Sequence, residues 1–155
     1  MGNQNLVPVL VTFDTTSANQ NHVPVLISLT PADSLLSTTS INGKATGATL
    51  LFTVPAGKTA IVTKAQLHMT SASNVTGVAT VSIGKTTAEW QDIIAEIALT
   101  GFDTTGMVAT LTPIALTAVS TAAAGTIKID VDAAATTTGG DDTYTFNVYL
   151  YGYLI

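Results

Sequence analysis

The chain has 155 residues, with 5 Lys or Arg and 10 Asp or Glu, so its formal net charge is −5 at pH 7. It contains no arginine, which disfavours a nucleic acid or an anionic membrane as partner because such sites need clustered cations. It contains no cysteine, which excludes disulfides, cysteine-ligated metals and thiol catalysis. Only 10% of the residues are charged. We expect a surface so poor in charge to be covered by other subunits of an assembly.

Residues 1–48 are rich in Asn, Ser and Thr, and we predict that they form an extended N-terminal arm. The arm contains a repeat at an offset of 16 residues, because Asn5–Phe13 (NLVPVLVTF) returns as Asn21–Leu29 (NHVPVLISL). Proline has no N–H to donate to a sheet, so Pro8 and Pro24 place these segments at a sheet edge or on another protein surface. An alternative is that the two copies are the first two strands of the domain itself. The expected anchors are Val7, Pro8, Val9, Leu10, Val23, Pro24, Val25 and Leu26.

Residues 49–155 are predicted to form a β-domain, because apolar and polar residues alternate along several short segments. The turn Pro55–Lys58 closes a hairpin, since proline presets one turn position and glycine tolerates a positive φ at another. In the strand that follows, one face is predicted to be buried, and it consists of Ile61, Thr63, Ala65, Leu67 and Met69. Further strands are predicted over residues 75–83, 107–111, 114–119, 126–131 and 143–154.

One segment departs from the period of two. Thr86–Glu89 has the spacing of a capping box, and apolar residues follow it at i, i+3, i+4 and i+7. These residues are Trp90, Ile93, Ile94 and Ile97. The pattern predicts a short helix over about Thr87–Ala98. The alternative is a strand in which Ile93, Ala95, Ile97 and Leu99 share one face.

The last predicted strand has both faces occupied. One face is predicted to carry Tyr144, Phe146, Val148, Leu150 and Leu154, and the other Thr145, Asn147 and a row of tyrosines, Tyr149, Tyr151 and Tyr153. Tyrosines cover apolar area and keep a hydroxyl available, a composition favoured where proteins meet. We expect these three tyrosines to lie in the subunit interface of a homo-oligomer, with a trimer as the expected state.

No constellation of catalytic residues is recognisable, and we expect neither an enzyme nor a bound cofactor. His22 and His68 are 46 positions apart and lack metal-site spacing, and no serine lies in a nucleophile motif. On the predicted helix, Glu89, Asp92 and Glu96 are read as a solvated face. The densest acidic group offers oxygen ligands for Ca²⁺, but it lacks a calcium-loop motif, so solvated loop residues are the favoured reading. This group consists of Asp130, Asp132, Asp141 and Asp142.

The segment Leu51–Thr63 (LFTVPAGKTAIVT), the alternating strands after it and the ending Tyr149–Ile155 (YLYGYLI) resemble small β-sandwich structural proteins of tailed-bacteriophage virions. The resemblance covers about residues 50–155 and includes head-decoration, head-fibre and tail-associated proteins. It agrees with an all-β fold, a two-sheet sandwich of jelly-roll type with about eight strands, one short helix and an extended N-terminal arm. Members of this class are often trimers that hold neighbouring capsomers together.

The expected function is that of a capsid decoration, or cement, protein on the virion surface. Its expected partners are further copies of itself and the major capsid protein or another virion protein, with no nucleic acid and no membrane. The arm repeats would add several weak contacts whose affinities multiply. The alternative is a receptor-binding or tail-fibre tip module whose loops bind a cell-surface glycan. Exposed aromatics at loop tips would favour that alternative, and here only Trp90 is a candidate.

Overall fold

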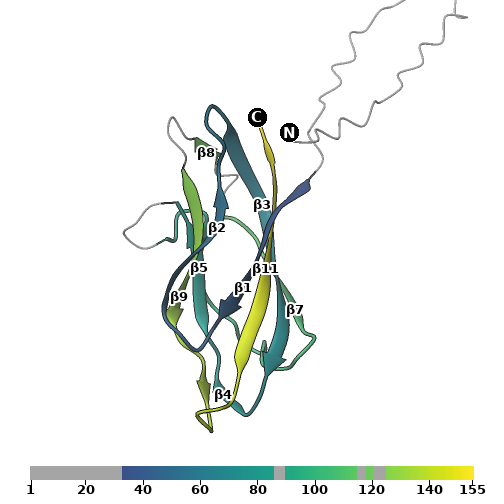
Figure 1. The fold of residues 1–155 in the computed structure, drawn as a ribbon, viewed down its shortest axis with the longest axis vertical. Helices are drawn as coiled ribbons and strands as arrows, with labels where there is room; N and C mark the ends of the chain where they lie inside the picture. The colour runs from purple at the N-terminus through teal and green to yellow at the C-terminus, as the bar shows by residue number, and fades with distance from the viewer. Residues whose placement is uncertain (1–32, 86–89, 115–117, 121–124) are drawn as a thin grey trace, which may run out of the picture. The chain divides into compact units, whose positions relative to one another are not determined.

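The computed structural model describes residues 33–85, 90–114, 118–120 and 125–155 (Figure 1). Pro31–Ile155 is a compact unit, and its described residues form strands, turns and loops without a helix. Within these residues there is accordingly no helix long and apolar enough to cross a membrane. The strands are β1 (Ser34–Asn42), β2 (Gly47–Thr53), β3 (Thr59–Ala72), β4 (Val75–Gly77), β5 (Thr80–Gly84), β6 (Ile94–Ala98), β7 (Val108–Leu111), β8 (Ala118–Ser120), β9 (Thr126–Ala133), β10 (Thr136–Thr137) and β11 (Tyr144–Leu154).

The strands form two main antiparallel sheets. The first has the order β1-β11-β3-β7. The strand β8 pairs with the first residues of β3, before the part of β3 that pairs with β7. The second has the order β2-β9-β5-β6, and the short strands β10 and β4 pair separately. Strands that are adjacent in a sheet are therefore mostly distant in the sequence, as β1 and β11 show.

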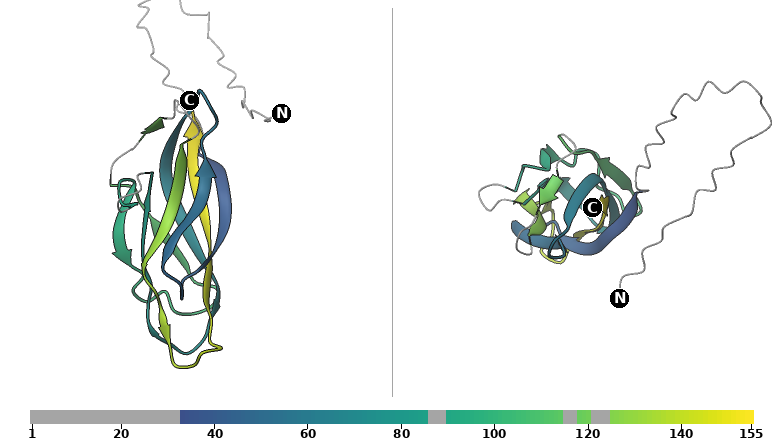
Figure 2. Two further views of the ribbon diagram at one scale, coloured as in Figure 1. Left: turned by 60° about the vertical axis from the view of Figure 1, so that its left-hand side comes forward. Right: turned by 90° about the horizontal axis from the view of Figure 1, so that it is seen from above.

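The two sheets share one hydrophobic core. Along β11 buried and partly exposed residues alternate from Tyr144 to Tyr153, and β9 alternates in the same way, as expected for strands with one buried face. The inward side chains of both sheets belong to one cluster, which includes Val62 and Phe146 from the first sheet and Ile83 and Ile129 from the second. Both views in Figure 2 show the strands surrounding this common interior. The described part of the unit is therefore all-β and sandwich-like.

An aromatic cluster closes one end of this core. Phe146 meets Phe102 and Tyr144 edge to face, with ring centroids 6.0 and 6.1 Å apart. The hydroxyl of the buried Tyr144 donates a hydrogen bond of 2.6 Å to the carbonyl oxygen of Phe102. Burial raises the pKa of Tyr144 to about 12. These contacts attach the loop after β6 to the central strand β11.

The helix predicted over Thr87–Ala98 is wrong. Ile94–Ala98 is strand β6, which pairs with β5 so that Ile94 lies opposite Ile83. Trp90 has a φ of 48°, which a right-handed helix cannot contain. The isoleucines at 93, 94 and 97 are β-branched and favour a strand once a partner strand is present. The strand alternative is thus the correct element, while residues 86–89 lie outside the described residues.

The predicted face of β3 is correct over only part of the strand. Ala65, Leu67 and Met69 are buried as expected, but before them Ala60 and Val62 are buried while Ile61 and Thr63 are partly exposed. A register shift against β11 explains the change, because Tyr151 lies opposite Lys64 while Gly152 lies opposite Val62. The extra residue on β3 is a β-bulge, and it exchanges the two faces of the strand.

The sheets begin before the predicted domain boundary at residue 49. Within the range 1–48 assigned to the arm, Ser34–Asn42 is paired with β11, and Ile41 is buried in the core. Thr39 and Ile41 alternate with more exposed neighbours as an edge strand requires. An arm therefore has to end before β1. The predicted anchors Val7–Leu10 and Val23–Leu26 lie outside the described residues.

Candidate interaction surfaces

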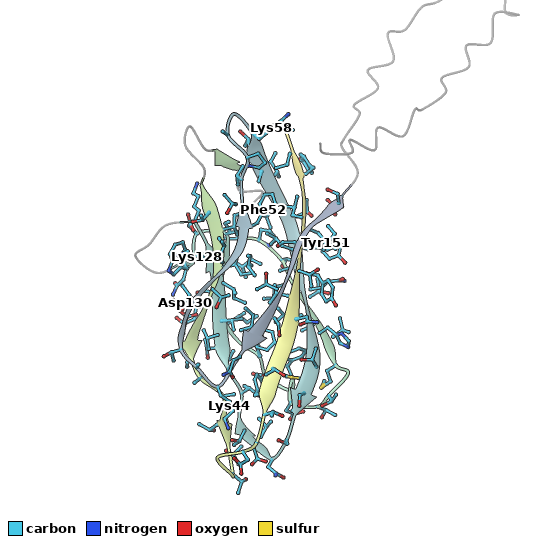
Figure 3. The ribbon with its side chains drawn as sticks, viewed as in Figure 1. Lys44, Phe52, Lys58, Lys128, Asp130 and Tyr151 are labelled. Carbon is cyan, nitrogen blue, oxygen red and sulfur yellow. The ribbon has the colours of Figure 1, made fainter. Side chains whose placement is uncertain are left out.

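The outer side of the first sheet carries the predicted tyrosine row. Tyr149, Tyr151 and Tyr153 are partly exposed on β11, on the side opposite to its buried residues. Tyr151 is labelled in Figure 3. Their cross-strand partners come from β1 on one side and from β3 on the other. We call this surface the tyrosine face, and it consists of Leu35, Thr38, Ile61, Lys64, Gln66, Tyr149, Tyr151 and Tyr153.

The tyrosine face is nearly without charge. Lys64 is its one charged side chain, and the Lys64 Nζ lies 4.7 Å from the centroid of the Tyr151 ring. This cation–π contact places the ammonium against an aromatic ring and covers the stem of the lysine with apolar area. Leu35 is 51% exposed at the edge of the same face. Aromatic enrichment and charge depletion are typical of the buried centre of a protein interface.

A second surface lies between the two sheets, where β6 approaches the segment that contains β7. It is a groove of about 230 Å³, which we call the edge groove. Within the described part of the chain β6 pairs only with β5, and β7 only with β3, so each has one edge without a strand partner there. The residues that line the groove are Ile94, Ala95, Glu96, Ile97, Thr110, Leu111, Thr112 and Ile114.

The edge groove is apolar and open to solvent. Ile97 is 44% exposed and Ile114 is 64% exposed, and Glu96 is the one charged side chain of the lining. The backbone N–H of Ile114 donates to the carbonyl oxygen of Ile93 at 2.9 Å, which holds the two walls together at one end. The sequence pattern does not indicate this groove, because a helix over the same residues buries Ile97 instead of placing it at a sheet edge.

The structure does not gather the four aspartates into a metal centre. Asp130 and Asp132 lie on the outer side of β9, and Asp141 and Asp142 lie in the turn before β11. Among the residues that the structure describes, no three Asp, Glu or His side chains come together as metal ligands. His68 lies on β3 opposite Asn147 and Val108, and His22 lies outside the described residues.

Hydrogen bonds hold the turn at Asp142 in place. The Asp142 carboxylate accepts from the side-chain amide of Asn74 at 2.8 Å and from the N–H of Gly139 at 2.6 Å. These two bonds lower the pKa of Asp142. Lys44 donates from Nζ to the carbonyl oxygens of Asp142 at 2.6 Å and Gly140 at 3.2 Å. The Lys44 ammonium thus binds two backbone carbonyl oxygens of this turn.

The pair on β9 has a different environment. Burial, and secondarily the nearby Asp132 carboxylate, raise the pKa of Asp130. The Oδ2 atom of Asp132 is buried without a hydrogen-bond partner. Beside them on β9, the Nζ of Lys128 lies 4.6 Å from the centroid of the Trp90 ring. Because Trp90 is only 8% exposed, it is not an aromatic loop tip that could stack on a sugar.

The carboxylates that were assigned to a helix face have local structural contacts. Asp92 Oδ1 accepts from the N–H of Lys85 at 2.7 Å, and Glu96 Oε2 accepts from Gln91 Nε2 at 3.4 Å. Glu89 lies outside the described residues. Asp92 is in the loop and Glu96 is on β6, so the predicted common face does not exist.

Neither a family model nor a curated protein matches this chain. Among solved structures, a chain from the capsid asymmetric unit of cyanophage Pam1 is similar, with a TM-score of 0.50 and 18% identity over 98% of this chain and 99% of that one. A chain from the acid-stable capsid of Helicobacter pylori bacteriophage KHP30 aligns with a TM-score of 0.49 and 15% identity, over 79% of this chain and 90% of that one. At such low identity, the Pam1 match is a likeness of fold. It confirms at that level the resemblance to β-rich phage virion proteins.

Proposed function

We propose that this chain is a non-enzymatic structural protein of a bacteriophage virion and that it is located in the capsid. The observation that carries the proposal is the likeness to a Pam1 capsid chain, which extends over 98% of this chain and 99% of that one. The two candidate surfaces agree with such a role, because both offer apolar or aromatic area with little charge. A protein built to contact other proteins needs such surfaces.

The strand pairing supports a jelly-roll sandwich as the finer description of the fold. When β4, β8 and β10 are set aside, eight strands remain, and their pairing is nested. The first pairs with the last (β1 and β11), the second with the seventh (β2 and β9), the third with the sixth (β3 and β7) and the fourth with the fifth (β5 and β6). One long antiparallel hairpin folded over into two sheets has this pairing, and jelly rolls are double-sheet folds of eight strands.

Within the virion the proposed role is decoration of the capsid surface, in which the chain stabilises the head lattice as a homotrimer. Tyr149, Tyr151 and Tyr153 pack against a neighbouring copy, because the tyrosine face is nearly uncharged. The arm repeats, Val7–Leu10 and Val23–Leu26, anchor the trimer to a neighbouring copy or to the major capsid protein. Three arms that bind together multiply weak individual affinities.

Deletion of residues 1–30 tests the role of the arm, because every strand of the unit begins after residue 30. The full chain and the truncated chain are compared by circular dichroism and by binding to capsids of the source phage that lack this protein. We expect a folded truncated protein that has lost most of its affinity for capsids. Unchanged capsid binding by the folded truncation contradicts the anchor role. A full chain that ignores capsids but binds a cell-surface glycan identifies a receptor-binding module instead.

A second measurement tests the tyrosine face. Sedimentation of the full chain across a concentration series is expected to show a trimer. Tyr151→Ala is expected to weaken this association, whereas Leu50→Ala removes a more exposed apolar side chain from a strand of the second sheet and leaves the association unchanged. A monomer at high micromolar concentration, together with the absence of subunit contacts in a cryo-electron map of the particle, contradicts the proposal.

A further inference from the structure

The edge groove has the properties of a site that accepts an additional strand. We infer that it receives an N-terminal repeat, Asn5–Phe13 or Asn21–Leu29, from a neighbouring copy of this chain, laid beside β6. The inference deepens the proposed function, since it uses the anchor role of the repeats and names the surface that receives them. It concerns contacts between copies and does not require that the partner be a capsid.

The first argument is the edge of β6. Edge strands of soluble proteins are usually protected by lysine, proline or a covering segment, because an open edge pairs readily with another chain. Within Ile94–Ala98 there is no lysine and no proline, and four of its five residues are exposed. On the described residues the outer edge of β6 has no strand partner. An extended segment can therefore hydrogen-bond to it by β-augmentation.

The second argument is the apolar lining next to that edge. Ile97, at 44% exposure, and Ile114, at 64%, lie on the two walls of the groove. A strand added to β6 would place one of its faces against these side chains. The occupant must therefore be a segment whose alternate residues are apolar. One negative charge in the lining, Glu96, also disfavours an acidic occupant.

The third argument is the sequence of the repeats, which meets both requirements. In an antiparallel strand, every second residue points its N–H and C=O groups to the same neighbouring strand. The side chains of these alternate residues lie on one face of the sheet. The odd-numbered residues of both repeats are apolar: Val7, Val9, Val11 and Phe13 in the first, and Val23, Val25, Ile27 and Leu29 in the second. Both prolines, Pro8 and Pro24, are even-numbered, so one of the two possible strand directions turns both positions that lack an N–H away from β6, and the inference requires that direction.

The length of chain before β1 favours a neighbour as the donor. Only residues 30–33 separate Leu29 from Ser34, and they bridge at most about 17 Å. In the first sheet β1 and β7 lie at opposite edges, about 14 Å apart, and β6 belongs to the other sheet about 10 Å away. The second repeat thus has no slack with which to turn and pair with its own β6. The first repeat is separated from β1 by residues 14–33 and has the length to reach either its own β6 or that of a neighbour, so the length argument applies to the second repeat. A neighbour's arm has no such limit, and two repeats allow one arm to engage two grooves.

The test uses full-length chains and their self-association, measured by sedimentation velocity. Ile97→Lys places a charge in the groove, and Leu50→Lys places the same charge on a residue of similar exposure outside it. In the arm, Val9→Asp combined with Val25→Asp alters the apolar face, and Thr12→Asp combined with Ser28→Asp alters the other. We expect the groove variant and the apolar-face variant each to weaken the Kd of association about tenfold or more. The two controls are expected to stay within about twofold of the unmodified chain.

Mixing the variants distinguishes a neighbour from the same chain. The Ile97→Lys protein keeps an intact arm, and the Val9→Asp/Val25→Asp protein keeps an intact groove. If the arm binds a neighbour, the mixture recovers association that neither protein has alone. Failure of two folded variants to recover association overturns the inference, as does an unmodified chain that is monomeric at high micromolar concentration.

Two further controls keep the test decisive. Thermal midpoints and circular dichroism establish that each variant is folded, and Ile114→Lys, on the other wall, replaces Ile97→Lys if that protein does not fold. Because association is measured without capsids, the result is independent of capsid binding. A chain that exchanges arms but ignores capsids refutes the proposed function alone, and a chain that binds capsids without exchanging arms refutes the inference alone.

Discussion

Phe146 is the side chain whose removal tests most directly whether β11 organises the core. It is fully buried on β11, an inner strand of the first sheet, opposite Ile41 of β1 and Met69 of β3. Its ring also makes edge-to-face contacts with Phe102 and Tyr144. Phe146→Ala therefore removes contacts with two strands and with the loop after β6 in a single change.

The expected cost follows from the buried area. A buried aromatic side chain removes about 150–250 Å² from water, and at about 25 cal/mol per Å² the lower value corresponds to about 4 kcal/mol. Measured Phe→Ala changes in cores cost about 3–5 kcal/mol, which includes the cavity that is left. Typical domains have a total stability of about 5–15 kcal/mol. For a unit of this size the expected fall in Tm is about 10–20 °C.

The assay is thermal and urea unfolding followed by circular dichroism, with Phe52→Ala as the matched control. Phe52 lies on β2 beside a register shift and is only partly buried. The same chemical change there is expected to cost less than half as much free energy of unfolding. A Tm shift of only one or two degrees for Phe146→Ala would refute the assignment of the buried face of β11. Equal shifts for the two variants would show that burial does not determine the cost.

Three further changes test other parts of the unit. Tyr144→Phe leaves the buried Phe102 carbonyl without its hydrogen-bond donor, at a cost of about 1–3 kcal/mol in free energy of unfolding. Because the pKa of Tyr144 is raised, the unmodified protein loses stability between pH 10.0 and about 12, and this loss is expected to be absent from the variant. Urea midpoints measured as a function of pH test both effects. The pKa of Asp130 in the folded protein is raised above 3.8, so the stability of the protein falls as pH rises through that pKa. Asp130→Asn is therefore expected to stabilise the protein at pH 7 by up to about 1 kcal/mol and to have no such effect near pH 2. Urea titrations at the two pH values measure the difference. A Cβ on Gly152 would collide with the carbonyl oxygen of Ile61, so Gly152→Ala is expected to cost about 1–3 kcal/mol in thermal unfolding.

The sequence predicted well those strands that bury one face without interruption. β11 and β9 have a period of two over most of their length, and both lie at the centre of their sheets. The alternation is a local property, so it can be read without knowledge of the partners. The face of β3 was predicted correctly only after the bulge, because a single extra residue opposite Tyr151 and Gly152 exchanges the faces and leaves no local signal.

The segment that contains β6 was mispredicted for a different reason. Ile94 and Ile97 with Trp90 and Ile93 fit a period of 3.6, and a short apolar run is ambiguous between helix and strand. Two facts that the sequence pattern does not contain decide for the strand: the backbone of β5 is available as a partner, and Trp90 adopts a positive φ. The edge groove depends on the same facts. Hence the edge groove could not be predicted from the sequence, although the repeat of Asn5–Phe13 as Asn21–Leu29 is visible in it.

The symmetry of a trimer connects the two candidate surfaces. When a patch pairs with the same patch of another copy, the contact is isologous and produces a dimer, whereas a ring of three requires contact between two different patches. A tyrosine face that pairs with itself therefore predicts a dimer. An arm that enters a neighbour's groove is a contact between different patches, and it closes a ring or continues into an open array. If the free protein is a trimer, either different parts of the three tyrosine faces meet around the threefold axis or the tyrosine face meets another part of its neighbour, and the proposed arm-to-groove contact would supply the head-to-tail arrangement for the second case.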